Sequence, residues 1–582
     1  MNHRAASWLL AIGVSRRRRC LPALVLAAVL SGCGSSPPPA VVTIPPPAGE
    51  PPGTPAPPPP PLRTDCETST DPAAFASADA LWALEQKLDS YGLRATGNPS
   101  HQAYVAWLEA QLRAIPGIEM RTVDYPIQRW TQTGIGLEAG PVLGLLLPVP
   151  VSGAVPYALP TPADGVQAPL VYVPAGTAIS AANATGKLVL RDIVPGSVPN
   201  AVFTALEWWT YDPEQVLTQT IAGSYERDWL SSNVPDIEAA AAAGAAGVIF
   251  LHGLPRTQVQ DQYRPYEGLQ WPVPALYVGA DEAEQLKALA AVGGLARLKL
   301  TAVIEPASTR MLVATLPGAS EESLLIESHT DGTNALWDNG PLAMLEMARY
   351  FGQFVPACRA RTLRFVFSTA HLYQHLVTPW RDGSAEQYAQ EYDREYQDGT
   401  GVAVVVIEHL GARSYTAVPR SDGGPGRELV LTGGQEPNSF FVSESAGLQA
   451  ALLQAVIGRD LRQTIALRGA DLPGAHFPLH HSFGGEGNPY ILHLLPTIGF
   501  IVAPWTLFTP GYSLEGIDKD LMHRQALVFT DLIYKLSVLP RETLAGAVTA
   551  QRAARDELCA SGEDVSAYVR CEGSPSARGA NP

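Results

Sequence analysis

Residues 323–351 read SLLIESHTDGTNALWDNGPLAMLEMARYF and combine an apolar run, a polar loop and a second apolar segment. The first run is apolar without alternation, which predicts a strand that is buried on both faces. Pro341 stands where a helix can begin, and the residues after it carry a helical pattern. Strand, loop and helix in this order are the unit of an α/β fold.

The same alternation runs through the rest of this half of the chain. It predicts an α/β fold with a mostly parallel central sheet flanked by helices. Two further helices, each with a possible Ser cap, are expected over 77–92 and 100–115. The remaining strands are expected at 311–318, 362–369, 401–411 and 496–504, and the remaining helices at 445–459 and 521–537.

Histidines and carboxylates stand where several of these strands end. His329 closes the first strand, His371 follows the 362–369 strand, and Glu408 lies at the end of the next. Ligands of such sheets bind beyond the carboxyl ends of the strands. Nitrogen and oxygen donors of this kind are the ligands that zinc accepts. Asp331 is expected to orient the His329 imidazole, and Asp338 to add a further carboxylate.

The 323–351 stretch resembles the first metal-binding segment of the dizinc exopeptidase family, which includes zinc aminopeptidases and relatives of glutamate carboxypeptidase and the transferrin receptor. Members carry His-x-Asp at a strand end and then Asp-Asn leading into a helix. Residues 94–99 (RATGNP) resemble the family's Arg-x-Thr-Gly-Ser-Pro loop. Residues 239–250 (AAAAAGAAGVIF) and 271–286 look like a protease-associated domain. The resemblance covers roughly residues 76–540 and implies metal ligands at His329, Asp338 and Glu408.

The chain departs from the family at the catalytic positions. Where members have two glutamates, a general base and a zinc ligand, this chain has His371 and Leu372. Where members have their last histidine ligand, it has Phe508. Both private ligands of one zinc are therefore apolar here. The resemblance implies at most one zinc ion and weak or no catalysis, with His371 as a substitute base, a substitute ligand or a plain polar residue.

Other polar residues near these segments have less specific interpretations. His409 is expected on the opposite face of its strand from Glu408. His476, His480 and His481 lie in a Pro- and Gly-rich loop and are expected to be exposed, although a replacement ligand could come from there. Glu486 lies near a position where the family often has an acidic residue.

The N-terminal segment has the features of an export signal. Arg16–Arg19 form a basic run, and the apolar stretch 21–30 is too short to span a bilayer. Leu30-Ser31-Gly32-Cys33 resembles the lipobox of bacterial lipoproteins, which implies a signal peptide over 1–32 and a lipid on Cys33. Gly34 then resembles an outer-membrane sorting signal, for a protein facing the periplasm or the exterior.

The chain of 582 residues divides into several expected parts. A proline-rich polyproline II linker is expected at 33–66. The main domain is expected at 67–149 and 304–540, with a separate β-rich protease-associated-like insert at 150–303 and a polar tail at 541–582.

Charge and cysteines limit the partners and the covalent links. The net charge of -16 makes nucleic acid and anionic headgroups unfavourable partners. After Cys33 the chain has four cysteines, Cys66, Cys358, Cys559 and Cys571, which allow three pairings. Cys559–Cys571 is the first expectation, and Cys358 could instead be a free thiol.

Three functions agree with these observations. The first is an aminopeptidase-like hydrolase with one metal, and the second is a non-catalytic protein that binds peptides or proteins on the same scaffold. The third is glutaminyl cyclase, which ranks last because its single zinc uses the ligands that Leu372 and Phe508 replace. The sequence does not indicate the substrate or ligand.

Overall fold

The computed structural model describes residues 61–217, 223–265, 270–373, 383–469, 485–561 and 571. The chain divides into two units, Met1–Pro61 and Leu62–Pro582, and only the second is described below. Cys33, the signal segment and the histidines at 476, 480 and 481 lie outside the described residues. Within the described ranges, no helix combines the length and the apolar character needed to cross a bilayer.

Four neighbouring parallel strands form the centre of the main sheet. They are, in spatial order, β13 (Thr362–Ser368), β12 (Ser323–His329), β14 (Gly401–Ile407) and β19 (Thr497–Phe500). Every residue of β12 and β14 is buried, as the lack of polar alternation in their apolar stretches predicts. Beyond β19 follow β17 (Asn438–Val442), β18 (Thr464–Arg468) and β7 (Glu207–Tyr211). The predicted α/β fold class with a mostly parallel sheet is confirmed.

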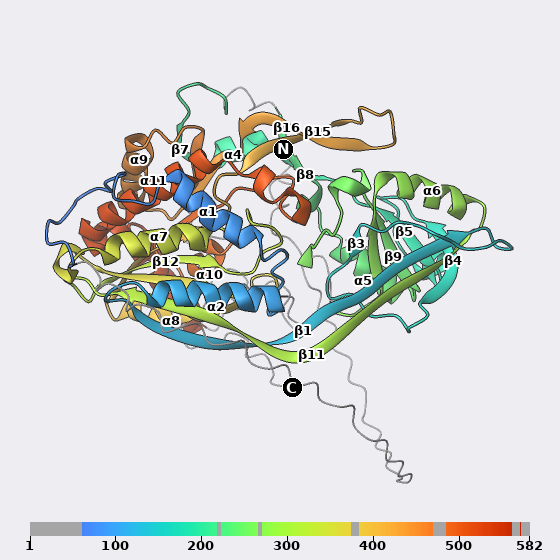
Figure 1. Cartoon of the computed structure of the whole chain (residues 1–582), viewed down its shortest axis with the longest axis horizontal. Coiled ribbons are helices and arrows are strands. Elements are labelled where there is room, and N and C mark those ends of the chain that lie inside the picture. The colour runs from blue at the N-terminus through green and yellow to red at the C-terminus, as the bar shows by residue number, and fades with distance from the viewer. Residues whose placement is uncertain are drawn as a thin grey trace, which may run out of the picture. The chain divides into compact units, whose positions relative to one another are not determined.

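Helices cover both faces of this sheet (Figure 1). One face shares a large core with α1 (Ala78–Asp89), α2 (Pro99–Arg113), α7 (Gly340–Gly352), α9 (Ala446–Gly458) and α11 (Lys519–Val538). The other face packs against α8 (Gly383–Gln397). Ser77 caps α1 as expected, whereas α2 is capped by Asn98 rather than Ser100.

The chain between α2 and the end of β11 contributes most of a second hydrophobic core. Its parallel strands are β4 (Val166–Tyr172), β5 (Leu188–Asp192), β9 (Gly247–Leu251) and β10 (Ala275–Val278). Two helices accompany them, α5 (Val234–Ala242) and α6 (Ala280–Ala291). The small-residue helix α5 leads into the fully buried strand β9, as the sequence predicts.

A long antiparallel ribbon joins the two cores. β1 (Glu119–Gly140) pairs with β11 (Leu295–Leu316) along its length, from Glu119 opposite Thr315 to Gly140 opposite Leu295 (Figure 1). β11 also pairs with β13 at one end and with β4 at the other. The insert boundary predicted at residue 303 therefore falls inside one continuous strand. In addition, β7, which lies within the predicted insert, pairs with β18 of the main sheet. One strand of the insert is therefore part of the main sheet.

Two disulfides join the described cysteines, Cys66 to Cys358 and Cys559 to Cys571. Cys358 is thus not a free thiol. The predicted polar tail contains two helices, α12 (Arg541–Ala545) and α13 (Val548–Ser561). The shorter elements are β2 (Leu147–Pro148), β3 (Gly153–Ala154), α3 (Ala181–Ala184), β6 (Gly196–Pro199), α4 (Asn200–Leu206), β8 (Ser224–Arg227), β15 (Arg413–Pro419), β16 (Arg427–Gln435) and α10 (Gly487–Leu492).

Candidate metal centre

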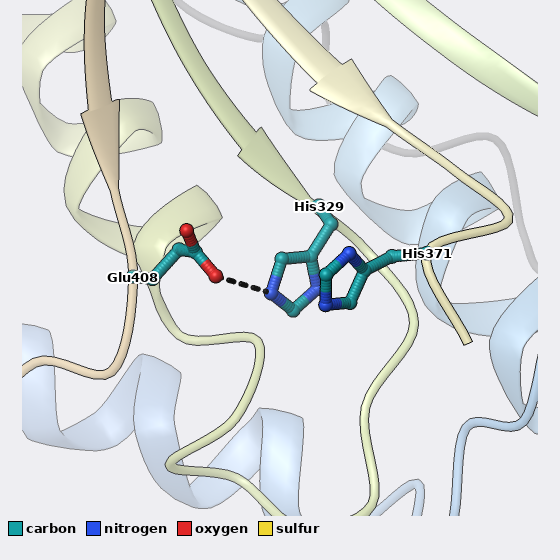
Figure 2. A group of neighbouring side chains, drawn as sticks. All are labelled: His329, His371 and Glu408. Atoms are coloured by element: carbon teal, nitrogen blue, oxygen red, sulfur yellow. Dashed lines mark ion pairs between the residues drawn. The ribbon is translucent and has the colours of Figure 1, made fainter. Parts of the chain in front are cut away.

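Three side chains from the ends of neighbouring strands meet in a buried cluster. His329 is the last residue of β12, His371 follows β13, and Glu408 follows β14 directly. One donor atom from each lies within 4.8 Å of the other two. Figure 2 shows the two imidazoles side by side, with the Glu408 carboxylate facing them. We call these residues the His-His-Glu cluster. It lies at the carboxyl edge of the sheet, where such folds bind ligands.

The His329 imidazole is held by a main-chain contact. Its Nδ1 lies 2.9 Å from the backbone oxygen of Asp331, which leaves Nε2 directed into the cluster. That Nε2 faces Glu408 Oε2 at 3.5 Å, longer than a normal hydrogen bond, although both atoms are buried. Burial would raise the pKa of Glu408, but His329, His409 and His371 hold it below its ordinary value.

His371 reaches the cluster through a turn of the backbone after β13. Ala370 adopts a left-handed conformation with a φ of 63°, and the His371 ring stacks on His329 with centroids 4.2 Å apart. The backbone N–H groups of His371 and Leu372 donate to the Asp331 carboxylate, at 3.3 and 2.8 Å. Asp331 was expected to orient His329 with its side chain. It does so with its backbone carbonyl, and its carboxylate fixes the loop that carries His371.

Glu486 contacts two members of the cluster, although its position in the sequence is only a weak indication of a site residue. Its carboxylate Oε1 lies 2.6 Å from His371 Nδ1, and its backbone N–H donates to Glu408 Oε1 at 2.8 Å. Gly485 permits this approach, because a Cβ there would lie 2.1 Å from that Glu408 oxygen. Besides the family's acidic residue near this position, the Gly-Glu-Gly sequence at 485–487, at the start of α10, is a sequence signal for this contact.

The structure does not bring Asp338 into the cluster. Its carboxylate is bound by the Arg94 guanidinium, with Arg94 Nε 2.7 Å from Oδ2 and Nη2 2.5 Å from Oδ1. Both side chains are fully buried. A two-point contact of this kind occupies both oxygens and neutralises the carboxylate. The cluster therefore differs from the expected ligand set of His329, Asp338 and Glu408, because it contains His371 and not Asp338.

Apolar side chains fill the space beside the cluster. Leu372 and Phe508 are buried together with Trp337, Leu507 and Tyr263, and the Phe508 and Trp337 rings lie 4.5 Å apart. Leu372 and Phe508 cannot donate an electron pair to a metal, as the sequence indicates.

Residues of the predicted insert contact both of these positions. The Tyr157 hydroxyl donates to the Leu372 carbonyl at 3.2 Å, and the Tyr263 N–H donates to the Phe508 carbonyl at 3.0 Å. This part of the chain therefore contacts the carboxyl edge of the main sheet at Leu372 and Phe508.

His409 lies closer to the site than expected. β14 ends at Ile407, so the alternation of side chains no longer applies, and His409 has a φ of 58°. Its Nδ1 contacts the Val502 carbonyl at 2.6 Å, and its Nε2 lies 3.9 Å from Glu408 Oε2. Burial lowers the pKa of His409 to about 4, so the ring is neutral at pH 7.

The donor set of the cluster fits a zinc ion. Two imidazoles and one carboxylate are common zinc ligands, and an additional position is open in many zinc sites. His329 Nε2 and Glu408 Oε2 are buried without a normal hydrogen bond, a state in which polar atoms usually have water or an ion as partner. Burial and the nearby Glu486 raise the pKa of Glu327, the buried carboxyl group on β12, well above its ordinary value.

Comparison with known proteins supports the fold. No protein-family model matches the chain, and no curated protein matches it. BSAP, a zinc aminopeptidase from Bacillus subtilis, matches with 16% identity and a TM-score of 0.51 over 79% of this chain and 94% of that chain. A peptidase M28 precursor from Shewanella amazonensis SB2B matches with 16% identity and a TM-score of 0.51 over 79% and 96%. At these identities the likeness shows the fold alone, which is zinc exopeptidase-like.

Proposed function

We propose that the chain is a lipid-anchored protein of the bacterial cell envelope that binds peptides on a zinc-exopeptidase-like scaffold, holds at most one zinc ion, and hydrolyses peptides weakly or not at all. The observation that carries this proposal is the His-His-Glu cluster beside buried Leu372 and Phe508. His329, His371 and Glu408 offer three donor atoms for one ion. Leu372 and Phe508, in the adjacent space, offer none.

Each residue of the proposed site has a separate task. His329, His371 and Glu408 would hold the ion, which when bound supplies a Lewis acid and an activated water. Glu486 fixes the His371 ring and also donates its N–H to Glu408. Position 371 carries a histidine that serves as a ligand, so no carboxylate there can take a proton from water. Glu486 is already engaged with His371 and Glu408. Weak catalysis follows from this arrangement.

A purely non-catalytic peptide-binding protein is the second candidate. The aromatic rings of Trp337 and Phe508 favour it, because they place an apolar surface where a second metal would otherwise be bound. Glutaminyl cyclase remains the least favoured function, since Leu372 and Phe508 occupy the positions of its ligands. The segment with its own core would be the protease-associated part that borders the peptide site.

Metal analysis of the purified chain tests the proposal directly. We expect no more than one zinc per chain, and we expect His371→Ala or Glu408→Gln to remove it. His523→Gln, a half-buried histidine on α11 outside the cluster, is the matched control and should keep the metal. Two ions per chain, or one ion that survives both cluster variants, would contradict the site.

Activity measurements separate the degenerate site from a working enzyme. We expect little turnover of aminopeptidase substrates, and His371→Glu combined with Leu372→Glu should not restore it while Phe508 remains. Robust wild-type turnover that His371→Ala abolishes would show that other ligands complete the centre, and the 476–481 histidines would be the first to examine.

Cell fractionation tests the proposed anchor. Because the lipid would be attached to Cys33, Cys33→Ala should remove the diacyl modification while leaving the folded part intact. Metabolic labelling with a radioactive fatty acid should mark the parent chain and not the variant. Equal labelling and equal membrane recovery of both chains would refute the lipoprotein assignment.

A further inference from the structure

An exposed apolar loop follows β1 at one end of the ribbon that β1 forms with β11. The residues from 140 to 150 read GPVLGLLLPVP and contain no charged or hydrogen-bonding side chain. Val142, Leu143, Leu145 and Leu147 are 54%, 101%, 78% and 57% exposed. Scattered exposed leucines are common, but a contiguous group this apolar marks a surface that contacts another apolar phase.

The loop is a defined turn at the far end of the ribbon. The Gly144 N–H donates to the Pro141 carbonyl at 2.9 Å, and a Cβ on Gly140 would lie 2.4 Å from the Leu145 carbonyl oxygen. Gly140 pairs with Leu295, whereas the opposite end of the ribbon, at Glu119, pairs with Thr315 near the parallel strands. About 20 residue steps of roughly 3.3 Å separate these ends, so the turn is carried on the order of 65 Å along the ribbon.

The composition of the loop favours lipid over protein as its partner. Protein interfaces concentrate Trp, Tyr and Arg and make about one hydrogen bond per 100–200 Å². This loop offers only Val, Leu, Pro and Gly side chains. Glu138 and Arg297, which pair with each other in the ribbon next to the loop, form an ion pair at 2.9 Å. Its attraction to another phase is therefore hydrophobic and does not depend on headgroup charge, which agrees with a chain of net charge -16.

We propose that the 141–147 loop inserts into the surface of a lipid bilayer and provides a membrane contact separate from the proposed lipid on Cys33. Roughly 30 residues lie between Cys33 and Leu62, and fully extended they reach up to roughly 100 Å. This reach is longer than the ribbon, so an anchored chain can bring the loop to the same bilayer. The contact does not involve the His-His-Glu cluster.

A probe on the loop of the full-length processed chain tests the insertion. Leu143→Cys is labelled with a polarity-sensitive dye, with the parent chain labelled in parallel as background, since its four other mature cysteines are paired. The chain is mixed with phosphatidylcholine vesicles with or without a quenching lipid. We expect a blue shift and quenching that persist in 1 M salt. Ile457→Cys, 51% exposed on α9, is the matched control and should show neither.

A second variant links the signal to the leucines. Adding Leu145→Asp to the Leu143→Cys chain should weaken vesicle binding of the loop about tenfold or more, with an unchanged circular dichroism spectrum. No shift at position 143, or equal quenching at 457, would overturn the proposal. A shift seen only with protein-containing native membranes would overturn it in favour of a protein partner. Because the dye reports the loop whether or not Cys33 is acylated, its failure is distinguishable from failure of the anchor.

Discussion

Glu486 connects two members of the His-His-Glu cluster, since it contacts His371 through its carboxylate and Glu408 through its N–H. Glu486→Gln keeps the shape and the backbone contact but removes the charge that orients the imidazole. Outer partners of this kind typically contribute 10–100-fold to metal affinity, so we expect zinc affinity to fall about tenfold or more. Competition with a chelating dye measures this. Glu346→Gln on α7 is the control and should leave the affinity unchanged. Equal affinities for both variants would contradict the role of Glu486.

Asp338 forms a buried ion pair with Arg94, so replacing it should change stability rather than metal content. Asp338→Asn should leave the zinc content unchanged but lower the free energy of unfolding by about 3 kcal/mol, because it leaves the Arg94 guanidinium buried without a counter-charge. Urea unfolding measures the loss. Replacing both residues, as Arg94→Met with Asp338→Leu, should recover much of it. Loss of zinc in Asp338→Asn would instead make Asp338 a ligand.

Part of this site could be predicted from the sequence, and the rest could not for physical reasons. His329, His371 and Glu408 could be found because each follows an apolar strand, and parallel strand ends converge. The Arg94–Asp338 pair spans 244 positions, and the Glu486–Glu408 contact spans 78, so no local spacing indicates either. His409 was misplaced because strand alternation was applied beyond the last residue of β14.

At the scale of elements, the buried strands were predictable and the ribbon was not. β14 is apolar throughout and β12 contains the apolar run 324–326, so their sequences alone indicate them. β1 and the middle of β11 are half exposed and lack a continuous apolar run. Each is stabilised by pairing with the other, a contact between segments that lie far apart in the sequence. The insert boundary was therefore placed where the composition changes, which is inside β11.

His493, whose carbonyl accepts a hydrogen bond from α13, makes a pH-dependent contribution to stability. His493 lies 3.3 Å from Asp393 and 3.6 Å from Glu386, and Arg552 of α13 donates to its carbonyl. Burial lowers the pKa of His493, but these two carboxylates outweigh it and raise the pKa above the ordinary value of 6.5. The stabilisation is thus fully present below pH 6.5 and is lost as the pH rises through the raised value.

His493→Gln tests this contribution. Melting temperatures of the parent chain, followed upward from pH 6, should fall by more than those of the variant. His523→Gln, whose histidine lies elsewhere on α11, should keep the parent's dependence. Parallel curves for the parent and His493→Gln would remove His493 as the cause.

At the scale of the whole molecule, the two disulfides differ in the length of chain that they close. Cys66–Cys358 spans 292 positions and Cys559–Cys571 spans 12. Chain-entropy estimates give about 5–6 kcal/mol for the long loop and about 3 kcal/mol for the short one. Cys66→Ser with Cys358→Ser should therefore destabilise the chain more than Cys559→Ser with Cys571→Ser. Denaturant unfolding compares them, and a larger loss from the short loop would contradict this ranking.

The Cys66–Cys358 bond also determines how the protein would bear mechanical load. Tension from a membrane tether would enter the folded part near Cys66 and pass through the covalent bond to Cys358, just ahead of β13. The helices α1 and α2 follow Cys66 in the chain and would carry none of this tension. The load would instead act along β13, which is hydrogen-bonded to β11 on one side and to β12 on the other. An oxidised chain would therefore pass the load to a strand that is hydrogen-bonded on both sides, whereas a reduced chain would pass it first to α1 and α2.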